Sequence, residues 1–340
     1  MAIISALGRY RVRMKIVENP SLLTYNTFGI DVKARRLVEV EDAAELCRIE
    51  EWEHPLLLGR GSDMVFTADY EGTVVRLAEE CEGKVKECDG GLSVWGGMVL
   101  DELVEHNIAE GYYGLENLSG VPGTVGAGVV QNVGAYGVEI GDVVQRVEVY
   151  DRQQCDFHWL NREECRFGYR NSVFKQQGGR YVVVRVELRL GRKFEPCLRY
   201  RAVEALPRGT AAEWREALLA LRWSKLPKPE EYGSAGSFFK NPVVGAAKYE
   251  ELRSRFEAMP EGHRVDGIEV AYKISAAWLI DQAGWKGRKM GRVGVWPQQA
   301  LVLYNAGHCV GSEVVALAAM IRHDVREKFG VELEPEAIII

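Results

Sequence analysis

The sequence predicts an α+β fold in which strands and helices are mixed but do not alternate as a regular series of βα units. Short runs that alternate apolar and polar residues, or that are rich in valine, indicate strands. Longer runs with apolar residues three and four positions apart indicate helices. The length of 340 residues, at roughly 100–200 residues per domain, indicates two or three domains.

The first part of the chain favours strands separated by single helices. We expect residues 1–19 to form an irregular leader. Asp42 is a candidate N-cap for the first helix, and Pro55 precedes the second strand. The stretch 111–141 is dense in glycine and carries few helix signals. Strands are expected at 37–40, 56–58, 73–77 and 92–95, and helices at 43–52 and 100–109.

The second part of the chain carries the strongest helix signal. Apolar residues of the longest predicted helix form one stripe, and Gly330 ends it. Gly284 ends the preceding helix in the same way, and the proline-punctuated stretch 225–229 is the best linker candidate. Strands are expected at 143–150, 181–190 and 300–304, and helices at 211–223, 275–283 and 313–329.

Composition excludes several classes of function. The formal charge is -6 and there is no long basic run, which argues against nucleic acid as a partner. No apolar run reaches the ~18–20 residues that span a bilayer, and the first residues lack the features of a secretory signal. The seven cysteines are scattered without metal-ligand spacing, so we expect no metal and reduced thiols in a cytoplasmic protein.

Glycine is the residue in excess: 36 of 340, or about 11%, against roughly 7% in average chains. Seventeen of the 36 lie between residues 59 and 141. Residues 59–63, Gly-Arg-Gly-Ser-Asp, follow a predicted strand, where successive N–H groups can form an anion-binding nest suited to a diphosphate. An ordinary glycine turn explains this segment equally well.

A second glycine-dense segment covers residues 120–137. It matches neither the G-x-G-x-x-G fingerprint nor a Walker loop. Small residues at this density let the backbone lie against a flat or charged ligand, and a purely structural loop rarely needs so many glycines. Gln131, Asn132 and Tyr136 add polar and aromatic groups to the segment.

Three further positions are candidates for chemistry. Arg170 lies between aromatic residues, a setting in which a guanidinium can bind a carboxylate, although a surface arginine is the simpler interpretation. Ser237 follows a glycine and precedes two phenylalanines, which indicates an exposed hydroxyl above an apolar pocket; the hydrolase elbow G-x-S-x-G is absent. Glu336 lies in an apolar stretch where a carboxylate can act as an acid, although a solvated glutamate is commoner.

Taken in order, these motifs resemble those of the UDP-N-acetylenolpyruvoylglucosamine reductase family, flavoenzymes that make UDP-N-acetylmuramic acid for bacterial cell walls. The resemblance runs from about Tyr25 to Glu336, and its eight motifs are specific as an ordered set. The matching segments are 26–29, 59–63, 122–127 with 131–137, 168–172, 236–242, 278–284, 299–303 and 333–336.

The resemblance implies a two-lobed FAD-binding domain of the vanillyl-alcohol-oxidase type and a smaller α+β substrate domain. The FAD-binding domain would cover 20–225, with lobes at 20–78 and 79–225, and the substrate domain 226–329. Residues 330–340 would return to the FAD-binding domain. The stretch around Tyr200 and the insert before Lys225 look like the longer of two family subtypes.

The same resemblance implies the site residues. The catalytic residues would be Arg170, Ser237 and Glu336. Residues expected to bind FAD are Gly59, Arg60, Gly61, Ser62, Asp63, Pro122, Gly123, Thr124, Gly126, Ala127, Gln131, Asn132, Gly134, Ala135 and Tyr136. Residues expected to bind the substrate are Tyr200, Lys225, Asn241 and Gln299.

The implied reaction uses FAD and NADPH on UDP-N-acetylglucosamine enolpyruvate. NADPH reduces the flavin and leaves, and the sugar then takes hydride at C3 of its enol ether. Arg170 and Glu336 would stabilise the enolate, Ser237 would protonate C2 with help from neighbours such as Lys240, and Lys225 would meet the diphosphate. In the first flavin loop, Arg60 and Asp63 depart from the family's usual residues. No aromatic substrate contact is placed within 262–271.

Two alternatives remain from the sequence. One is a sugar or alcohol oxidase of the same flavin fold, although the flavin loops contain no histidine for covalent attachment. The other is a nucleotide-sugar-binding protein without catalytic activity. Consumption of NADPH when the sugar is added separates the second from the reductase, and rapid reoxidation of the flavin by oxygen would favour the first.

Overall fold

The computed structural model describes residues 14–265 and 270–340, which divide into two compact units. Unit 1 comprises the described residues up to Pro20 together with Ala34–Gly59 and Glu71–Leu219; unit 2 comprises Ser21–Lys33, Arg60–Tyr70 and Ala220–Ile340. Both mix helices and strands, as the α+β prediction requires. The predicted domain boundaries stay a prediction. The compact units differ from them because residues 21–33 and 60–70 fold with the C-terminal part.

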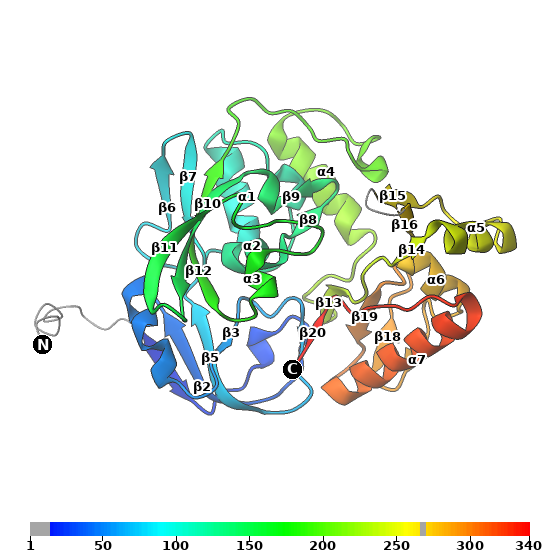
Figure 1. Cartoon of the computed structure of the whole chain (residues 1–340), viewed down its shortest axis with the longest axis horizontal. Coiled ribbons are helices and arrows are strands. Elements are labelled where there is room, and N and C mark those ends of the chain that lie inside the picture. The colour runs from blue at the N-terminus through cyan, green and yellow to red at the C-terminus, as the bar shows by residue number, and fades with distance from the viewer. Residues whose placement is uncertain (1–13, 266–269) are drawn as a thin grey trace, which may run out of the picture. The chain divides into compact units, whose positions relative to one another are not determined.

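Unit 1 is built on two sheets (Figure 1). One has the order β1 (Lys15–Glu18), β2 (Ala34–Val40), β5 (Tyr70–Leu77) and β3 (Leu56–Leu57). The other is antiparallel, in the order β11 (Asp156–Asn161), β10 (Val144–Asp151), β12 (Tyr181–Arg189), β7 (Gly91–Trp95) and β6 (Val85–Cys88). The expected leader is wrong for β1, which pairs with β2 from Lys15↔Glu39 to Glu18↔Arg36. Residues 1–13 of that leader lie outside the described residues.

Two apolar cores hold unit 1 together. In one, Leu92, Val147 and Val186 of the five-stranded sheet pack with Leu103 of α1 (Leu100–Ala109) and Val129 of α2 (Val125–Gln131). In the other, Val38 and Val75 of the four-stranded sheet pack with Tyr150 and Val184 of the five-stranded sheet. The five-stranded sheet therefore contributes to both cores, which is why its strands are so rich in valine.

The remaining elements of unit 1 are short apart from α4. The predicted helices at 100–109 and 211–223 are confirmed with the same ends, as α1 and α4. The segment predicted as a helix at 43–52 is a 3₁₀ helix over Ala43–Glu51, whose N-cap Asp42 accepts a hydrogen bond from the N–H of Ala44 at 3.0 Å. The unit also contains α3 (Val173–Gln176), β8 (Gly134–Ala135), β9 (Val138–Glu139) and single-turn 3₁₀ helices at Glu116–Leu118, Ile140–Asp142 and Arg201–Val203.

Helix α2 lies inside the stretch that showed few helix signals, so that interpretation is wrong for residues 125–131. Thr124 caps its start by accepting from the N–H of Ala127, and Asn132 ends it in the left-handed conformation with φ 44°. Two glycines within seven residues lower the helix propensity, by roughly 1 kcal/mol each relative to alanine. Packing on the sheet overrides this local preference: a Cβ on Gly126 would lie 3.0 Å from the carbonyl oxygen of Gly96 and 3.1 Å from that of Val183.

Unit 2 combines a four-stranded antiparallel sheet, a three-stranded one and a short parallel pair. Figure 1 shows α7 beside the four-stranded sheet. Its predicted apolar stripe, from Val314 to Phe329, is fully buried, and Gly330 ends it with φ 63°. The strands are β13 (Ser234–Ser237), β19 (Val302–Asn305), β18 (Val293–Val295), β17 (Lys289–Met290); β14 (Val243–Gly245), β16 (Ala271–Lys273), β15 (His263–Val265); and β20 (Ile338–Ile339) with β4 (Met64–Val65). The helices are α5 (Ala246–Arg255), α6 (Ala276–Gln282) and α7 (Gly311–Phe329).

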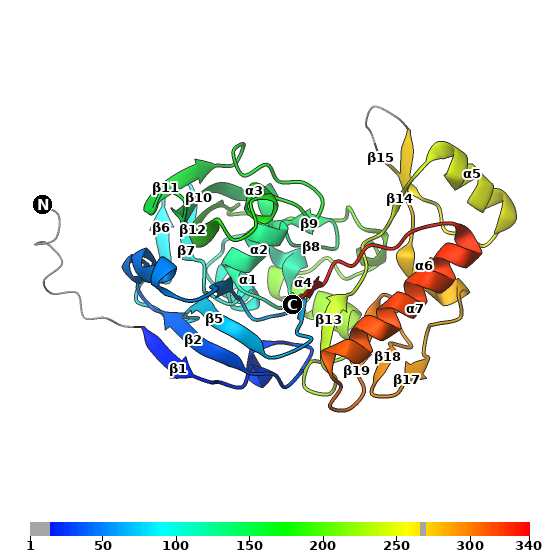
Figure 2. The same ribbon diagram turned by 60° about the horizontal axis from the view of Figure 1, so that its bottom comes forward.

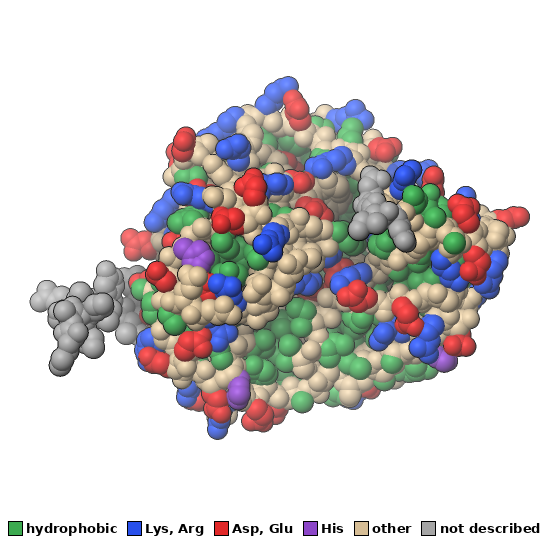
Figure 3. Space-filling view, in the orientation of Figure 1, with side chains coloured by type: hydrophobic (Ala, Val, Ile, Leu, Met, Phe, Trp, Pro, Cys, Tyr) green, Lys and Arg blue, Asp and Glu red, His purple; other side chains and the backbone are tan. Residues whose placement is uncertain are grey.

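The surface carries both signs of charge. On the face shown in Figure 3, lysine and arginine side chains are interspersed with aspartate and glutamate, in keeping with the small net charge. Within residues 14–265 and 270–340, none of the helices is both long and apolar enough to cross a membrane. All seven cysteines are free thiols, and burial raises the pKa of Cys165 to about 12 and that of Cys309 to about 11, which keeps both protonated at neutral pH.

We expect Gly126→Val to destabilise unit 1. The added side chain would press on the backbone of Gly96, just after β7, and of Val183 in β12, and overpacking of this kind costs about 1–3 kcal/mol. Gly245→Val is the matched control, because a Cβ there meets nothing within 4 Å and its φ of -65° suits any residue. Urea unfolding followed by circular dichroism should show a lower midpoint for Gly126→Val alone. Equal midpoints for the two variants would contradict the packing role.

We also expect Asp151→Asn to weaken the fold in a pH-dependent way. Arg180 donates to the fully buried Asp151 carboxylate at 2.6 Å and holds its pKa below the usual value of 3.8. Because the folded-state pKa is depressed, this stabilisation is present above about pH 4 and is lost as the pH falls through the folded-state pKa. The difference in unfolding free energy between wild type and variant should therefore shrink between about pH 7 and about pH 3. A constant difference would show that the carboxylate charge does not matter.

Candidate active site

Unit 1 contains the second glycine segment, residues 120–137. Several backbone N–H groups of this segment donate hydrogen bonds to other parts of the same unit. The N–H of Val125 donates to the carbonyl oxygen of Met98, and that of Gly126 to Gly96, both at 2.8 Å. The N–H of Ala127 donates to the Thr124 hydroxyl at 3.3 Å. The first N–H groups of α2 are therefore committed to protein acceptors, and the glycines here serve close packing of the helix on the sheet.

The two predicted flavin loops meet at Gly59. A Cβ on Gly59 would lie 2.9 Å from the Cβ of Ala127 and 3.0 Å from the Thr124 hydroxyl oxygen. Glycine fits this contact best, because a Cβ less than 3.0 Å from the Ala127 Cβ would force one of the two segments to shift. The two loops therefore approach each other so closely at Gly59 that no side chain fits between them. Such a close approach is expected of two segments that bind the same cofactor.

Asn132 organises the second loop with its side chain. It is 1% exposed; its amide donates to Glu139 Oε2 at 2.7 Å and to the carbonyl oxygen of Gly168 at 2.9 Å, and its Oδ1 accepts from the N–H of Gly141 at 3.0 Å. These three hydrogen bonds hold residues 132–141 and Gly168 in a fixed arrangement. Whether Asn132 also contacts FAD stays a prediction.

The structure joins the segment that carries Arg170 to the second loop. Arg170 donates from Nη2 to the carbonyl oxygen of Gly134 at 3.0 Å, and Ser172 donates to that of Val130 at 2.7 Å. Lys175 also hydrogen-bonds the Gln131 side chain. These contacts, with the Asn132 bond to Gly168, hold the segment of Arg170, a predicted catalytic residue, against the second predicted flavin loop. The order of the motifs along the chain does not by itself predict this contact.

Arg170 occupies an unusual backbone conformation. It lies in a turn closed by two hydrogen bonds of 3.0 Å between Gly168 and Asn171, and its φ is 52°. A non-glycine residue in this region costs of order 1–3 kcal/mol and is kept where the surroundings fix it, often at functional sites. Its guanidinium lies 5.6 Å from the centre of the Tyr169 ring.

Tyr136 and Tyr200 lie side by side in unit 1, with ring centres 5.8 Å apart in an edge-on arrangement. Tyr200 is 48% exposed, which leaves it accessible to a ligand. Asn117, which the sequence reasoning missed, holds this region: its amide donates to the carbonyl oxygens of Tyr136 at 2.8 Å and Cys197 at 3.0 Å, and accepts from the Trp214 indole at 2.8 Å. No local pattern marks Asn117, because all three partners are distant in sequence.

In unit 2, Ser237 ends β13 with an exposed side chain, and the two phenylalanines that follow it are buried. The exposure of Ser237 agrees with the prediction, whereas an apolar pocket beneath it stays a prediction. Residues 334–336 run antiparallel to 238–240: the N–H of Glu336 donates to the carbonyl oxygen of Phe238 at 2.8 Å, and that of Lys240 to Glu334 at 2.9 Å. The backbone of the half-buried Glu336 is therefore paired with the residue that follows Ser237. The Lys240 ammonium pairs with Glu334.

The other predicted residues of unit 2 are half-buried in segments that connect the elements. Asn241 Oδ1 accepts from the N–H of Ala276 at the start of α6 at 3.0 Å, and Gln299 Oε1 accepts from that of Leu301 at 3.3 Å. Lys225 follows α4. Of the range 262–271, residues 266–269 lie outside the described residues; Tyr272, which adjoins it, stacks on Tyr249 with ring centres 4.0 Å apart.

The first glycine loop is divided between the units, with Gly59 in unit 1 and residues 60–63 in unit 2. Gly61 has φ 60°, and a Cβ there would overlap the carbonyl oxygen of Tyr25, so glycine is required by the fold itself. The N–H of Thr27 donates to the Gly61 carbonyl at 3.2 Å. Of the catalytic candidates, Arg170 belongs to unit 1, whereas Ser237 and Glu336 belong to unit 2.

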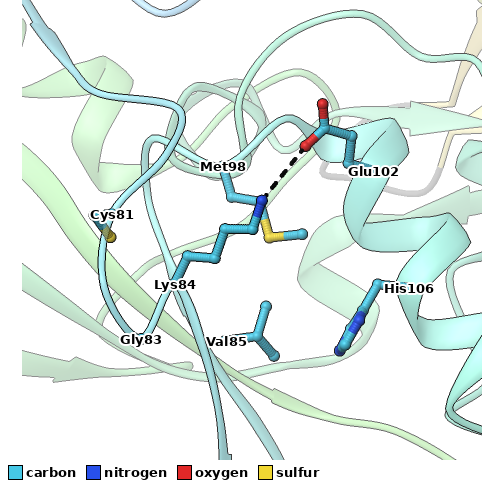
Figure 4. Close-up of a pocket in the computed structure, with 7 residues that line it drawn as sticks. All are labelled: Cys81, Gly83, Lys84, Val85, Met98, Glu102 and His106. Atoms are coloured by element: carbon cyan, nitrogen blue, oxygen red, sulfur yellow. Dashed lines mark ion pairs between the residues drawn. The ribbon is translucent and has the colours of Figure 1, made fainter.

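A separate pocket of about 400 Å³ in unit 1 contains none of the predicted site residues (Figure 4). Lys84 points into it from the segment before β6, and Glu102 and His106 line it from α1. Lys84 lies 2.6 Å from Glu80 and 3.8 Å from Glu102. With two carboxylates near its ammonium group, the pocket offers little attraction to an anion.

Two family models match the chain. An FAD binding domain matches residues 30–156, and the C-terminal domain of UDP-N-acetylenolpyruvoylglucosamine reductase matches residues 228–340. They cover the two glycine loops and Ser237 through Glu336, respectively. Together they support the two-domain α+β fold with a flavin-binding part that the motif order implied.

Curated relatives match along nearly the whole chain. The UDP-N-acetylenolpyruvoylglucosamine reductase of Pseudomonas aeruginosa is 44% identical over 336 residues, covering 95% of this chain and 98% of the relative. That of Bacteroides fragilis is 40% identical over 331 residues, covering 94% and 98%. The crystal structure of the Thermus caldophilus enzyme aligns with a TM-score of 0.67 at 27% identity, covering 96% of this chain and 98% of the other. The chain therefore belongs to the UDP-N-acetylenolpyruvoylglucosamine reductase family.

Proposed function

We propose that this protein reduces UDP-N-acetylglucosamine enolpyruvate to UDP-N-acetylmuramate with NADPH, through FAD, in bacterial peptidoglycan precursor synthesis. The observation that carries the proposal is the match along 95% of the chain to a reductase of this name at 44% identity, together with family models of the flavin-binding and C-terminal parts. NADPH and nucleotide sugars are cytoplasmic metabolites, and seven free thiols agree with a reducing compartment, so we place the enzyme in the cytoplasm.

FAD would be held between the two glycine loops. When bound, it supplies the two-electron carrier that accepts hydride from NADPH and returns it to C3 of the enol ether. Residues 59–63 and 134–136 offer backbone and side-chain contacts to it. Within residues 122–127, the N–H groups of 125–127 already have protein acceptors, so these three residues would contribute mainly shape.

Arg170 would stabilise the negative charge that develops toward the substrate carboxylate when C3 receives hydride. A guanidinium offers a planar pair of donors to a carboxylate. The bond from Nη2 to the Gly134 carbonyl and the closed turn around it would hold the group before substrate arrives, so that little reorganisation is needed in the transition state.

Ser237 would deliver a proton to C2 of the enolate, and Glu336 would stabilise the same charge beside it. The exposed hydroxyl of Ser237 and the backbone bond from Glu336 to Phe238 support this pairing. Lys240 was named as one neighbour that could help Ser237, and its ammonium is paired with Glu334. We therefore assign Lys240 to holding the segment that carries Glu336.

The nucleotide part of the substrate would be met by Tyr200, Lys225, Asn241 and Gln299. A lysine ammonium suits a diphosphate, and an exposed tyrosine offers both an apolar face and a hydroxyl. Asn241 and Gln299 each use their side-chain oxygen to accept a backbone N–H, which orients the amide for a polar contact to the sugar or the base.

We expect the purified protein to be yellow, with an FAD spectrum that NADPH bleaches and that UDP-N-acetylglucosamine enolpyruvate restores without oxygen. Anaerobic stopped-flow absorbance at the flavin band measures both half-reactions. A colourless protein, or one whose reduced flavin is reoxidised only by oxygen, would overturn the proposed reaction.

We expect Ser237→Ala to keep flavin reduction by NADPH and to slow reoxidation by the sugar about 10²–10⁴-fold, the usual contribution of a general acid. Ser234→Ala, on the same strand but half-buried, is the matched control and should leave both steps unchanged. Equal slowing of both half-reactions in Ser237→Ala would contradict the proton-transfer role.

A further inference from the structure

The segment that follows α7, residues 334–340, is attached to two other parts of unit 2. Its first part lies against the chain after Ser237. The N–H of Lys240 donates to the Glu334 carbonyl, the N–H of Glu336 donates to the Phe238 carbonyl, and Phe239 and Pro335 form an antiparallel bridge between these bonds. The Lys240–Glu334 ion pair adds a side-chain contact to the same ladder.

Its second part lies against the chain after the first glycine loop. The N–H of Ile338 donates to the carbonyl oxygen of Asp63 at 2.8 Å, and that of Ile340 to Val65 at 3.0 Å. The backbone and the hydroxyl of Thr67 both donate to the Ile340 carbonyl at 2.7 Å. Figure 2 shows the segment, in red, running from the end of α7 to the C-terminus.

These attachments depend on backbone hydrogen bonds more than on side-chain burial. Ile338 and Ile339 are 42% and 43% exposed, so their side chains contribute little apolar burial to the pairing. Asp63 is the last residue of the loop, and Gly61 two residues before it is held through its own carbonyl by Thr27. The Ile338 bond therefore fixes the far end of a glycine loop that would otherwise lose much conformational entropy on binding a ligand.

We propose that residues 334–340 act as a strap that positions two parts of the predicted site. The backbone hydrogen bond from Ile338 to Asp63 positions the first flavin loop, and the ion pair between Lys240 and Glu334 positions Glu336 beside the segment of Ser237. This rests on the proposed function, since it takes residues 59–63 to bind FAD. The strap preorganises the loop, so its loss weakens cofactor binding even when the fold survives. Lys240, Glu334 and Ile338 are positioning residues in this scheme and do not touch the reacting atoms.

The flavin half of the strap is tested by a pair of proline variants. Ile338→Pro removes the N–H that donates to Asp63. Ile339→Pro is the control, because alternate residues of a strand bond the neighbouring strand and the bonds of Ile338 and Ile340 direct the N–H of Ile339 away from β4. The rate of FAD release from diluted holoenzyme, followed by flavin fluorescence, should rise about tenfold for Ile338→Pro and stay near wild type for Ile339→Pro.

Thr67→Val covers the case in which Ile338→Pro does not fold. It removes one hydroxyl from the Ile340 carbonyl at an exposed position, and we expect about threefold faster FAD release. Wild-type release rates for both Ile338→Pro and Thr67→Val, or equal acceleration by the two proline variants, would overturn the strap. A wild-type protein that holds FAD but does not pass hydride from NADPH to the sugar would instead contradict the proposed function, and the release rates would still test the strap.

The catalytic half is tested by exchanging charges. Lys240→Glu and Glu334→Lys each break the ion pair and should slow flavin reoxidation by the sugar about tenfold without changing flavin reduction by NADPH. The double exchange should recover most of the rate. Lys248→Glu, which breaks the pair with Glu251 on α5, is the control and should change neither step. A double variant no faster than either single one would overturn the positioning role of this pair.

Discussion

The close approach of α2 to the five-stranded sheet is the constraint on which the flavin-binding unit depends. The N–H groups of Val125 and Gly126 bond directly to the chain that leaves β7, and neither Gly96 nor Gly126 has room for a side chain. The two ends of α2 then carry the site. Thr124 at its start contacts Gly59 of the first loop, and Val130 and Asn132 at its end bond the segment that bears Arg170.

This constraint changes the meaning of the glycine excess. High glycine density in residues 120–137 indicates a close approach, but the partner of the closest approach is the protein's own sheet. The glycines of α2 therefore serve close packing as well as any contact with FAD, because the N–H groups of Val125 and Gly126 already have acceptors in the protein.

The elements that the sequence predicted best have complete local signals. Helices α1 and α4 have the predicted ends, and α7 has the predicted stripe and glycine stop, because periodicity and caps lie within the helix itself. Helix α2 was missed because its glycines have a low intrinsic helix propensity. Strand β1 was missed because a four-residue edge strand is stabilised by pairing with its neighbour rather than by its own residue pattern. The site residues were predicted from the order of motifs, and their roles stay a prediction. The bonds that join them, such as those of Asn117 and Asn132, link distant segments and leave no trace in either one alone.

Three residues of the predicted site in unit 1 have a left-handed backbone conformation. Asn132, Tyr136 and Arg170 are non-glycine residues with positive φ, and each belongs to the predicted machinery. Each is held by a bond from a distant segment: Asn132 through Gly168, Tyr136 through Asn117, and Arg170 through Gly134. A left-handed residue points its side chain where an ordinary turn would not, at a cost of order 1–3 kcal/mol that other contacts must offset. The interlocking bonds supply that offset, so the direction of the Arg170 guanidinium is set by the folded scaffold before any ligand binds.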